Sequence, residues 1–125
     1  PYLAAADVMI TDHSSAGFEY LLLDRPLIRI HLPELLRTSN INEEYVRLLA
    51  DAAESVEGPV QALSSVETAL ADPSRRSPSR RHVADDLFYR PGTATARAVE
   101  ELYRTMELAP VPASYAVHDQ ASVSL

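Results

Sequence analysis

Residues 6–20 read ADVMITDHSSAGFEY, an apolar run that ends in small polar residues just where a helical pattern begins. Val8 to Ile10 predict a short buried strand, and apolar side chains then recur at helical spacing from Phe18 onward. The residues from Asp12 to Ser15 must therefore form a turn between strand and helix. Such a turn directs backbone N–H groups and the positive end of a helix dipole toward a nearby anion, so the stretch predicts a phosphate site.

The composition limits the classes of protein to which the chain can belong. Its 125 residues are about one domain, and its hydrophobic share of 46% is ordinary for a globular fold. The formal net charge of −7, without a single lysine, argues against a nucleic-acid partner or a general anionic surface. No segment approaches the roughly 20 apolar residues that cross a bilayer, so we expect this part of the chain to be soluble.

The second predicted strand defines the fold class. Asp24 to Pro26 interrupt the first helix, and Leu27 to Leu32 then read as a strand with β-branched residues. The order strand, helix, strand predicts a parallel crossover, in which the helix covers one face of the sheet. Ligands of open α/β sheets gather at the carboxyl ends of the strands, which indicates the Asp12–Ser15 turn and, more loosely, the segment from His31 to Glu34.

The remaining segments are expected to continue this α/β pattern. Residues 33–40 look irregular, and a capping box at Ser64–Glu67 predicts the start of a helix. We also predict a helix over 42–53 and a short edge strand over 54–57. Further along the chain we predict a helix over 80–89 and an amphipathic helix over 93–107. We expect a partial domain over residues 1–108 and a loose tail over 109–125. Because the chain opens on what reads as the end of a helix, we also expect it to be a fragment.

Two blocks of sequence resemble the CDP-glycerol glycerophosphotransferase family. They are residues 6–26, with ADVMITDHSS followed by FEYLLLDRP, and residues 87–99, LFYRPGTATARAV. Members of that family are similar to GT-B glycosyltransferases, in which two Rossmann-like domains face a cleft and the C-terminal one holds the nucleotide. The resemblance implies a partial Rossmann-like α/β domain, with parallel strands and flanking helices, that lacks its N-terminal acceptor domain. Glu19 and His13 depart from the family pattern, which commonly has aspartate and tyrosine there.

The resemblance also implies an activity and its partners. The whole enzyme would move glycerol phosphate from CDP-glycerol, or another nucleotide-diphosphate donor, to a hydroxyl of a cell-envelope polymer or lipid-linked acceptor. It would work in the cytoplasm, with peripheral attachment at the inner face of the cell membrane left open. The fragment alone would be inactive. A nucleotide-sugar glycosyltransferase and a non-catalytic module docking through its helices stay open as alternatives. We expect no cofactor, no nucleic-acid partner and no metal, since the chain has no cysteine and His31, His82 and His118 are too scattered.

The candidate site residues lie in the turn and the helix that follows it. Ser14 and Ser15 are expected to donate hydrogen bonds to phosphate, and the alternative for both is plain helix capping. Glu19, about one helical turn on, would accept from ribose hydroxyls, or is an acid favoured by the helix dipole. His13 is the candidate catalytic residue, donating to a phosphate or leaving group, unless it is a solvated turn histidine. Asp12 is expected to anchor the turn through backbone amides.

A dense arginine cluster is the other candidate anion site. Arg75, Arg76, Arg80 and Arg81 could bind phosphate, an anionic lipid surface or a polyanion. They could equally pair with the many acidic side chains of the chain. In so acidic a protein we favour the second interpretation.

Overall fold

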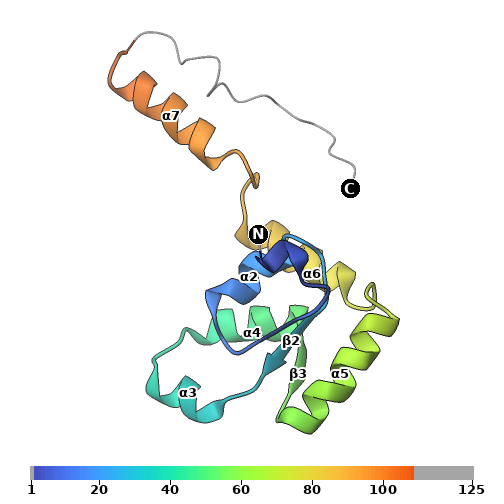
Figure 1. Cartoon of the computed structure of the whole chain (residues 1–125). Helices are drawn as coiled ribbons and strands as arrows, with labels where there is room; N and C mark the ends of the chain where they lie inside the picture. The colour runs from blue at the N-terminus through green and yellow to red at the C-terminus, as the bar shows by residue number, and fades with distance from the viewer. Residues whose placement is uncertain (1, 109–125) are drawn as a thin grey trace. The chain divides into compact units, whose positions relative to one another are not determined.

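The computed structural model describes residues 2–108 of the chain (Figure 1). The chain divides into two compact units, residues 1–87 and residues 88–125. The first unit contains the sheet and most of the helices, and the described residues of the second contain one helix.

A small parallel sheet forms the centre of the first unit. Its strands are β1 (Met9–Thr11), β2 (Leu27–Ile30) and β3 (Glu54–Val56), in the order β1-β2-β3. Both pairs are parallel, and the register aligns Thr11 with Arg29 and Arg29 with Ser55. The expected α/β class, the parallel crossover between the first two strands and the short edge strand are thereby confirmed.

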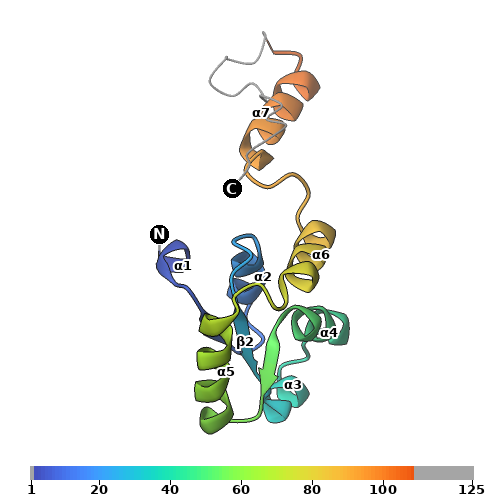
Figure 2. The same ribbon diagram turned by 90° about the vertical axis from the view of Figure 1, so that its right-hand side faces the viewer.

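Helices cover both faces of this sheet. Figure 2 shows α5 (Pro59–Ala71) on one side of the strands and α4 (Glu43–Ala52) on the other. Helices α2 (Ser15–Leu21) and α6 (Ser77–Leu87) pack with α4 in the same layer. On the side of α5, Ala62 of this helix packs with Ile28 and Val56 of the sheet. On the side of α4, the buried side chains are those of Tyr20, Leu21, Leu49 and Val83. This three-layer arrangement is consistent with a partial Rossmann-like domain.

Gly17 allows α2 to approach its neighbours closely. A Cβ at this position would lie 3.2 Å from Cδ1 of Leu49 and 3.2 Å from Cγ2 of Thr11. Few Cβ contacts in proteins are that short, because packed side chains resist compression. The missing side chain therefore lets α2 lie directly over β1 and α4, which fixes the direction in which the preceding turn leaves the sheet.

Three further elements differ from, or extend, the sequence expectations. Helix α1 (Tyr2–Ala5) is the expected end of a helix before β1. Helix α3 (Pro33–Thr38), in contrast, forms in the segment expected to be irregular. Pro33 is compatible with this helix because it lies in the first turn, where a backbone N–H has no intrahelical partner. The capping box was a wrong prediction. Helix α5 starts at Pro59 after Gly58, so Ser64 lies inside it and its hydroxyl donates to the Gln61 carbonyl at 3.0 Å.

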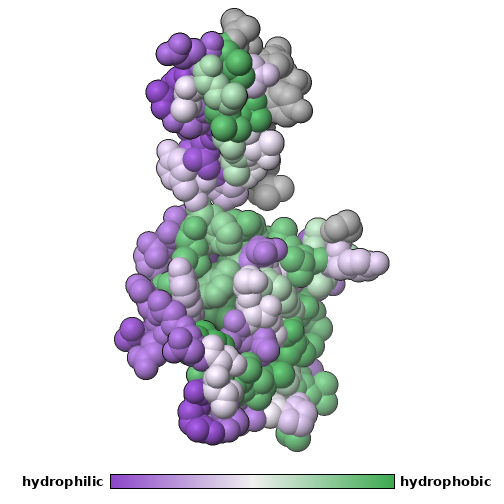
Figure 3. Space-filling view, turned by 90° about the vertical axis from the view of Figure 1, so that its left-hand side faces the viewer, coloured by the Kyte–Doolittle hydropathy of each residue, from purple (hydrophilic) through white to green (hydrophobic). Residues whose placement is uncertain are grey.

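The second unit consists, within the described residues, of α7 (Ala94–Thr105) and the segment before it. The predicted amphipathic helix is confirmed, and Figure 3 shows hydrophobic and hydrophilic surface side by side on this unit. Arg97 donates to Oγ1 of Thr93 at 3.1 Å, and its guanidinium stacks 4.7 Å from the centre of the Tyr89 ring. The tail expected over 109–125, with His118, lies outside the described residues.

Candidate functional site

The turn between β1 and α2 is held together by its own polar groups. Oδ1 of Asp12 accepts from the backbone N–H of Ser14 at 2.9 Å, which confirms Asp12 as the anchor of the turn. Ser14 is the N-cap residue of α2, and its Oγ accepts from the N–H of Ala16 at 3.3 Å. The N–H of Gly17 donates to the Ser14 carbonyl at 3.0 Å. The expectation that the turn presents free amides to an anion is therefore wrong for these three N–H groups.

The hydroxyls of the turn are still available as donors. A serine oxygen that accepts a capping hydrogen bond keeps its own O–H, so Ser14 can cap α2 and donate to a ligand at once. Ser15 is the first residue of α2 and is exposed, as is Glu19 one turn further along the helix. The structure places all three on or next to α2, which begins just after the carboxyl end of β1. Their contacts with phosphate and ribose stay predictions.

The structure brings a buried arginine to this edge of the sheet, and sequence reasoning missed it. Arg29 lies in β2 with 5% of its surface exposed. Its Nε and Nη2 donate to Oγ of Ser55 at 3.2 and 2.9 Å, and its Nη1 lies 3.4 Å from Nε2 of His13. None of the ion pairs formed among residues 2–108 includes Arg29. Arg29 is thus a buried cation with no carboxylate in ion-pair contact among the described residues, although the charge of Glu57 acts on it from further away. Such a cation is unusual, and an anionic ligand would supply a direct partner.

Burial and the neighbouring charges lower the pKa of His13. Burial lowers the pKa of His13, and the positive charge of Arg29 lowers it further, with His31 acting in the same direction and Asp12 opposing it. Burial also lowers the pKa of Arg29, against the effect of Glu57, but a guanidinium stays protonated at any pH at which the protein folds. The neutral imidazole is therefore favoured beside a permanent cation.

Two ring nitrogens at this edge have no hydrogen-bond partner. They are Nδ1 of His13 and Nδ1 of His31, both buried among the described residues. His31 directly follows β2, and its backbone N–H donates to the carbonyl of Val56 at 2.8 Å. The carboxyl ends of β1 and β2 thus carry two histidines and one guanidinium, a set of groups suited to an anion.

One sequence signal could have identified Arg29. A parallel strand that is covered on both faces reads as a nearly continuous apolar run, and Leu27 to Ile30 do so except at Arg29. A charged residue inside such a strand has to find polar partners. Which partners it finds depends on strand register, and the sequence does not show that.

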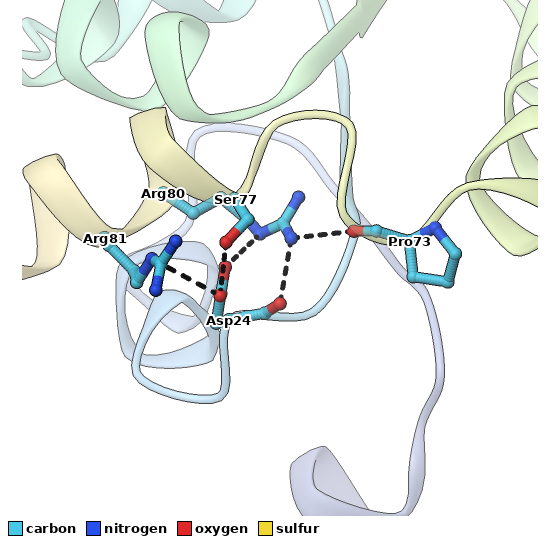
Figure 4. A network of polar contacts seen from close by, with 5 residues as sticks. All are labelled: Asp24, Pro73, Ser77, Arg80 and Arg81. Carbon is cyan, nitrogen blue, oxygen red and sulfur yellow. Dashed lines mark hydrogen bonds and ion pairs between the residues drawn. The ribbon is translucent and has the colours of Figure 1, made fainter. Parts of the chain in front are cut away.

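The arginine cluster pairs mainly with acidic side chains, as the favoured interpretation predicted. Arg80 is 2% exposed, and its Nε donates to Oδ1 of Asp24 at 3.0 Å while its Nη2 reaches the carbonyls of Asp24 and Pro73 (Figure 4). Arg81 lies 3.7 Å from the same carboxylate, and Ser77 donates to it at 2.6 Å. The carboxylate of Asp24 therefore pairs with both Arg80 and Arg81.

A cavity of about 90 Å³ lies at the opposite edge of the sheet. Its walls include the first residues of β2 and β3, Leu27 and Glu54, together with Arg76. Nε of Arg76 is already paired with Oε2 of Glu54 at 3.1 Å. Since the strands run away from this cavity toward His13, it is separate from the candidate site.

The described residues contain neither a metal-ligand cluster nor a membrane-spanning helix. Among residues 2–108, no group of three or more His, Cys, Asp or Glu side chains is arranged to hold a metal ion. None of the helices over those same residues is both long enough and apolar enough to traverse a bilayer.

Comparison with known proteins identifies the family that this chain resembles. A family model described as CDP-Glycerol:Poly(glycerophosphate) glycerophosphotransferase matches residues 2–105. The matched span contains the turn after β1, the Arg29 strand and α7. Neither a curated protein nor a solved structure matches the chain.

Proposed function

The chain belongs to the CDP-glycerol:poly(glycerophosphate) glycerophosphotransferase family, and from this premise we propose that it is the donor-binding part of such a transferase. The transferase would move glycerol phosphate from CDP-glycerol to a hydroxyl of a cell-envelope polymer or lipid-linked acceptor, in the cytoplasm or at the inner face of the membrane. One observation carries the assignment of the site. Arg29, His13 and Ser14 converge where parallel strands end, which is where open α/β sheets bind their ligands.

The transfer reaction requires the site to stabilise negative charge while one phosphate ester bond forms and another breaks. The acceptor hydroxyl attacks the β-phosphorus, its new P–O bond forms as the P–O bond to CMP breaks, and CMP leaves with the bonding electron pair. The hydroxyl proton passes to a general base, which we place in an N-terminal acceptor domain. Charge on the leaving phosphate would be balanced by the Arg29 guanidinium and by the hydroxyls of Ser14 and Ser15.

His13 and Glu19 have separate proposed roles. His13 lies in the turn itself, so once protonated it would donate a hydrogen bond to an oxygen of the leaving phosphate. Glu19, exposed on α2 one turn beyond Ser15, would accept from the ribose hydroxyls as the nucleotide runs along the helix. Both roles concern the donor, so acceptor choice would rest with the other domain.

Calorimetric titration of the full-length protein tests the proposal. We expect CDP-glycerol to bind, and Ser15→Ala to weaken binding by roughly tenfold, since a hydrogen bond to a charged group contributes about 1.5–3 kcal/mol. Ser39→Ala, at the end of α3, is the matched control and should bind as the wild type does. Binding of UDP or GDP sugars alone, unaffected by Ser14→Ala, would instead support the nucleotide-sugar glycosyltransferase.

One observation favours a non-catalytic interaction module as the second candidate. Leu102 on α7 and Met106, the residue that follows the helix, are 57% and 63% exposed, so a partner could pack against this apolar stripe. A full-length protein that binds none of the nucleotides but loses a partner on Leu102→Glu would favour this candidate. Nucleotide binding that survives Leu102→Glu would favour the transferase.

A further inference from the structure

The contact between Arg29 and His13 constrains where the histidine proton can be. A guanidinium has only N–H donors, so Nη1 of Arg29 can bond to Nε2 of His13 only if Nε2 offers a lone pair. A neutral imidazole that accepts at Nε2 carries its proton on Nδ1. The geometry therefore selects one charge state and one tautomer of His13.

We propose that Arg29 is a positioning residue that holds His13 neutral, with its proton on Nδ1, until a phosphate takes over the guanidinium. The inference rests on the proposed function for the role of His13 in transfer. It concerns the resting site, however, and can be tested without any donor.

Ser55 makes the arrangement rigid. Its single Oγ accepts from both Nε and Nη2 of Arg29, at 3.2 and 2.9 Å, and the two residues are paired in register across β2 and β3. With two of its nitrogens fixed on Ser55, the planar guanidinium can present Nη1 in only one direction. That direction leads to His13, in the turn after β1, so one arginine connects three successive strand ends.

The charges around His13 favour the neutral ring. Burial disfavours the imidazolium most, Arg29 and His31 add to that effect, and Asp12 acts against it. The charge of Glu57 acts on Arg29. The buried Nδ1–H that results lacks an acceptor within the described chain, so the resting ring is not fully satisfied.

Arrival of a phosphate would reverse this state. An anionic oxygen is a better partner for Nη1 than a neutral ring nitrogen, because it carries a charge opposite to that of the guanidinium and matches its donor geometry. When a phosphate oxygen replaces Nε2 as the acceptor of the Nη1–H, the lone pair of Nε2 is released and the ring takes up a proton from the buffered solvent. His13 then becomes a donor only when there is a phosphate to receive its hydrogen bond.

Nitrogen-15 NMR of the ligand-free full chain tests the proposal, with His13→Gln used to assign the signals. We expect an unprotonated Nε2 and a protonated Nδ1 in the wild type. Arg29→Met should raise the titration midpoint of His13 and shift its tautomers toward Nε2–H. Arg47→Met, which removes one positive charge from the exposed side of α4, is the matched control and should change neither signal.

Two further variants separate charge from geometry. Arg29→Lys keeps the charge but cannot bridge Ser55 and His13, so the midpoint should stay low while the tautomer preference is lost. Ser55→Ala keeps the guanidinium but frees it, and the tautomer preference should weaken. This variant tests the proposal even if Arg29→Met does not fold. A wild-type tautomer signal in Ser55→Ala would contradict the idea that the contacts of Arg29 with Ser55 fix the direction of Nη1.

The proposal is overturned by a wild-type ring protonated on Nε2, or by Arg29→Met with unchanged tautomer and midpoint. Saturating inorganic phosphate should raise the midpoint of His13 in the wild type, and an unchanged midpoint would overturn the release step. None of these measurements involves CDP-glycerol. A failure here is therefore distinguishable from a failure of the donor assignment.

Discussion

Nε of Arg80 lies 3.0 Å from Oδ1 of Asp24, and the arginine side chain is almost completely enclosed. Asp24 has a φ of 48°, a left-handed conformation that aspartate tolerates better than most residues. Its carboxylate also accepts from Ser77 at the start of α6. The Asp24–Arg80 pair therefore links α6 to the turn that follows α2. It thereby stabilises α2, the helix that carries Ser15 and Glu19 of the candidate site.

Removing the carboxylate should be costly. Asp24→Ala leaves the buried Arg80 guanidinium without its counter-charge, and breaking a buried pair in this way lowers the free energy of unfolding by about 3–5 kcal/mol. Arg81→Ala removes only an exposed contact to the same carboxylate at 3.7 Å, so we expect a change of about 0–1 kcal/mol. Urea denaturation of both variants measures the difference. Equal losses would show that the buried pair is not the stabilising one.

Gly17→Ala should destabilise the protein by about 1 kcal/mol. The added methyl group would press on Leu49 and Thr11 at 3.2 Å, and overpacking of about 1–3 kcal/mol exceeds the gain in helix propensity of about 0.5–1 kcal/mol. Gly58→Ala is the control, because nothing lies within 4 Å of a Cβ there and its extended backbone suits any residue. Thermal melts compare the two, and a stabilised Gly17→Ala would mean that the Leu49 side chain moves aside freely.

Substitutions at Ser14 should separate capping from ligand binding. Ser14→Ala removes the side chain that caps α2, at a cost of about 1 kcal/mol in stability, and also removes a phosphate donor. Ser14→Asp keeps the cap but places a negative charge where phosphate is expected. We predict that Ser14→Asp melts like the wild type and loses nucleotide binding in calorimetry. Wild-type affinity in Ser14→Asp would restrict Ser14 to its capping role.

The lowered pKa of His13 predicts a dependence of stability on pH. Because the folded pKa lies below the value of 6.5 for a free histidine, the unfolded chain binds more protons between the two values. The contribution of His13 to stability is therefore complete above pH 6.5 and is lost as the pH falls through the folded pKa. Chemical denaturation between pH 5 and pH 8 should show this slope, and His13→Gln should remove it. An unchanged slope in His13→Gln would assign it to another group.

Phosphate binding and pH should be coupled in the opposite direction. A bound anion favours the imidazolium, so phosphate binding should be accompanied by proton uptake near pH 6.5. Calorimetry in two buffers of different ionisation enthalpy measures the number of protons taken up. His13→Gln should bind with less uptake, and equal uptake in both proteins would exclude His13 as the proton acceptor.

Some of the candidate site was predictable because it depends on neighbours in the chain. The short strand, the turn with its Asp12 anchor and the start of α2 all follow from local polarity and helical spacing. The strand is found over Met9–Thr11 and not over Val8–Ile10, and Ile10 is 47% exposed, so the expected burial of the strand is wrong at that residue. The false capping box at Ser64 shows the limit of such patterns, because Pro59 after Gly58 opens the same helix earlier and more strongly. Local patterns identify an element more reliably than its first residue.

The sequence by itself determined the α/β class, the parallel crossover and the turn that carries His13, Ser14 and Ser15, because these depend on apolar periodicity and turn chemistry within a short stretch. Only the tertiary structure decided that Arg29 meets both Ser55, which is 26 residues away, and His13, which is 16 residues away. Strand register sets those contacts, and no local pattern encodes register. The same holds for Asp24 and Arg80, which packing joins across 56 residues.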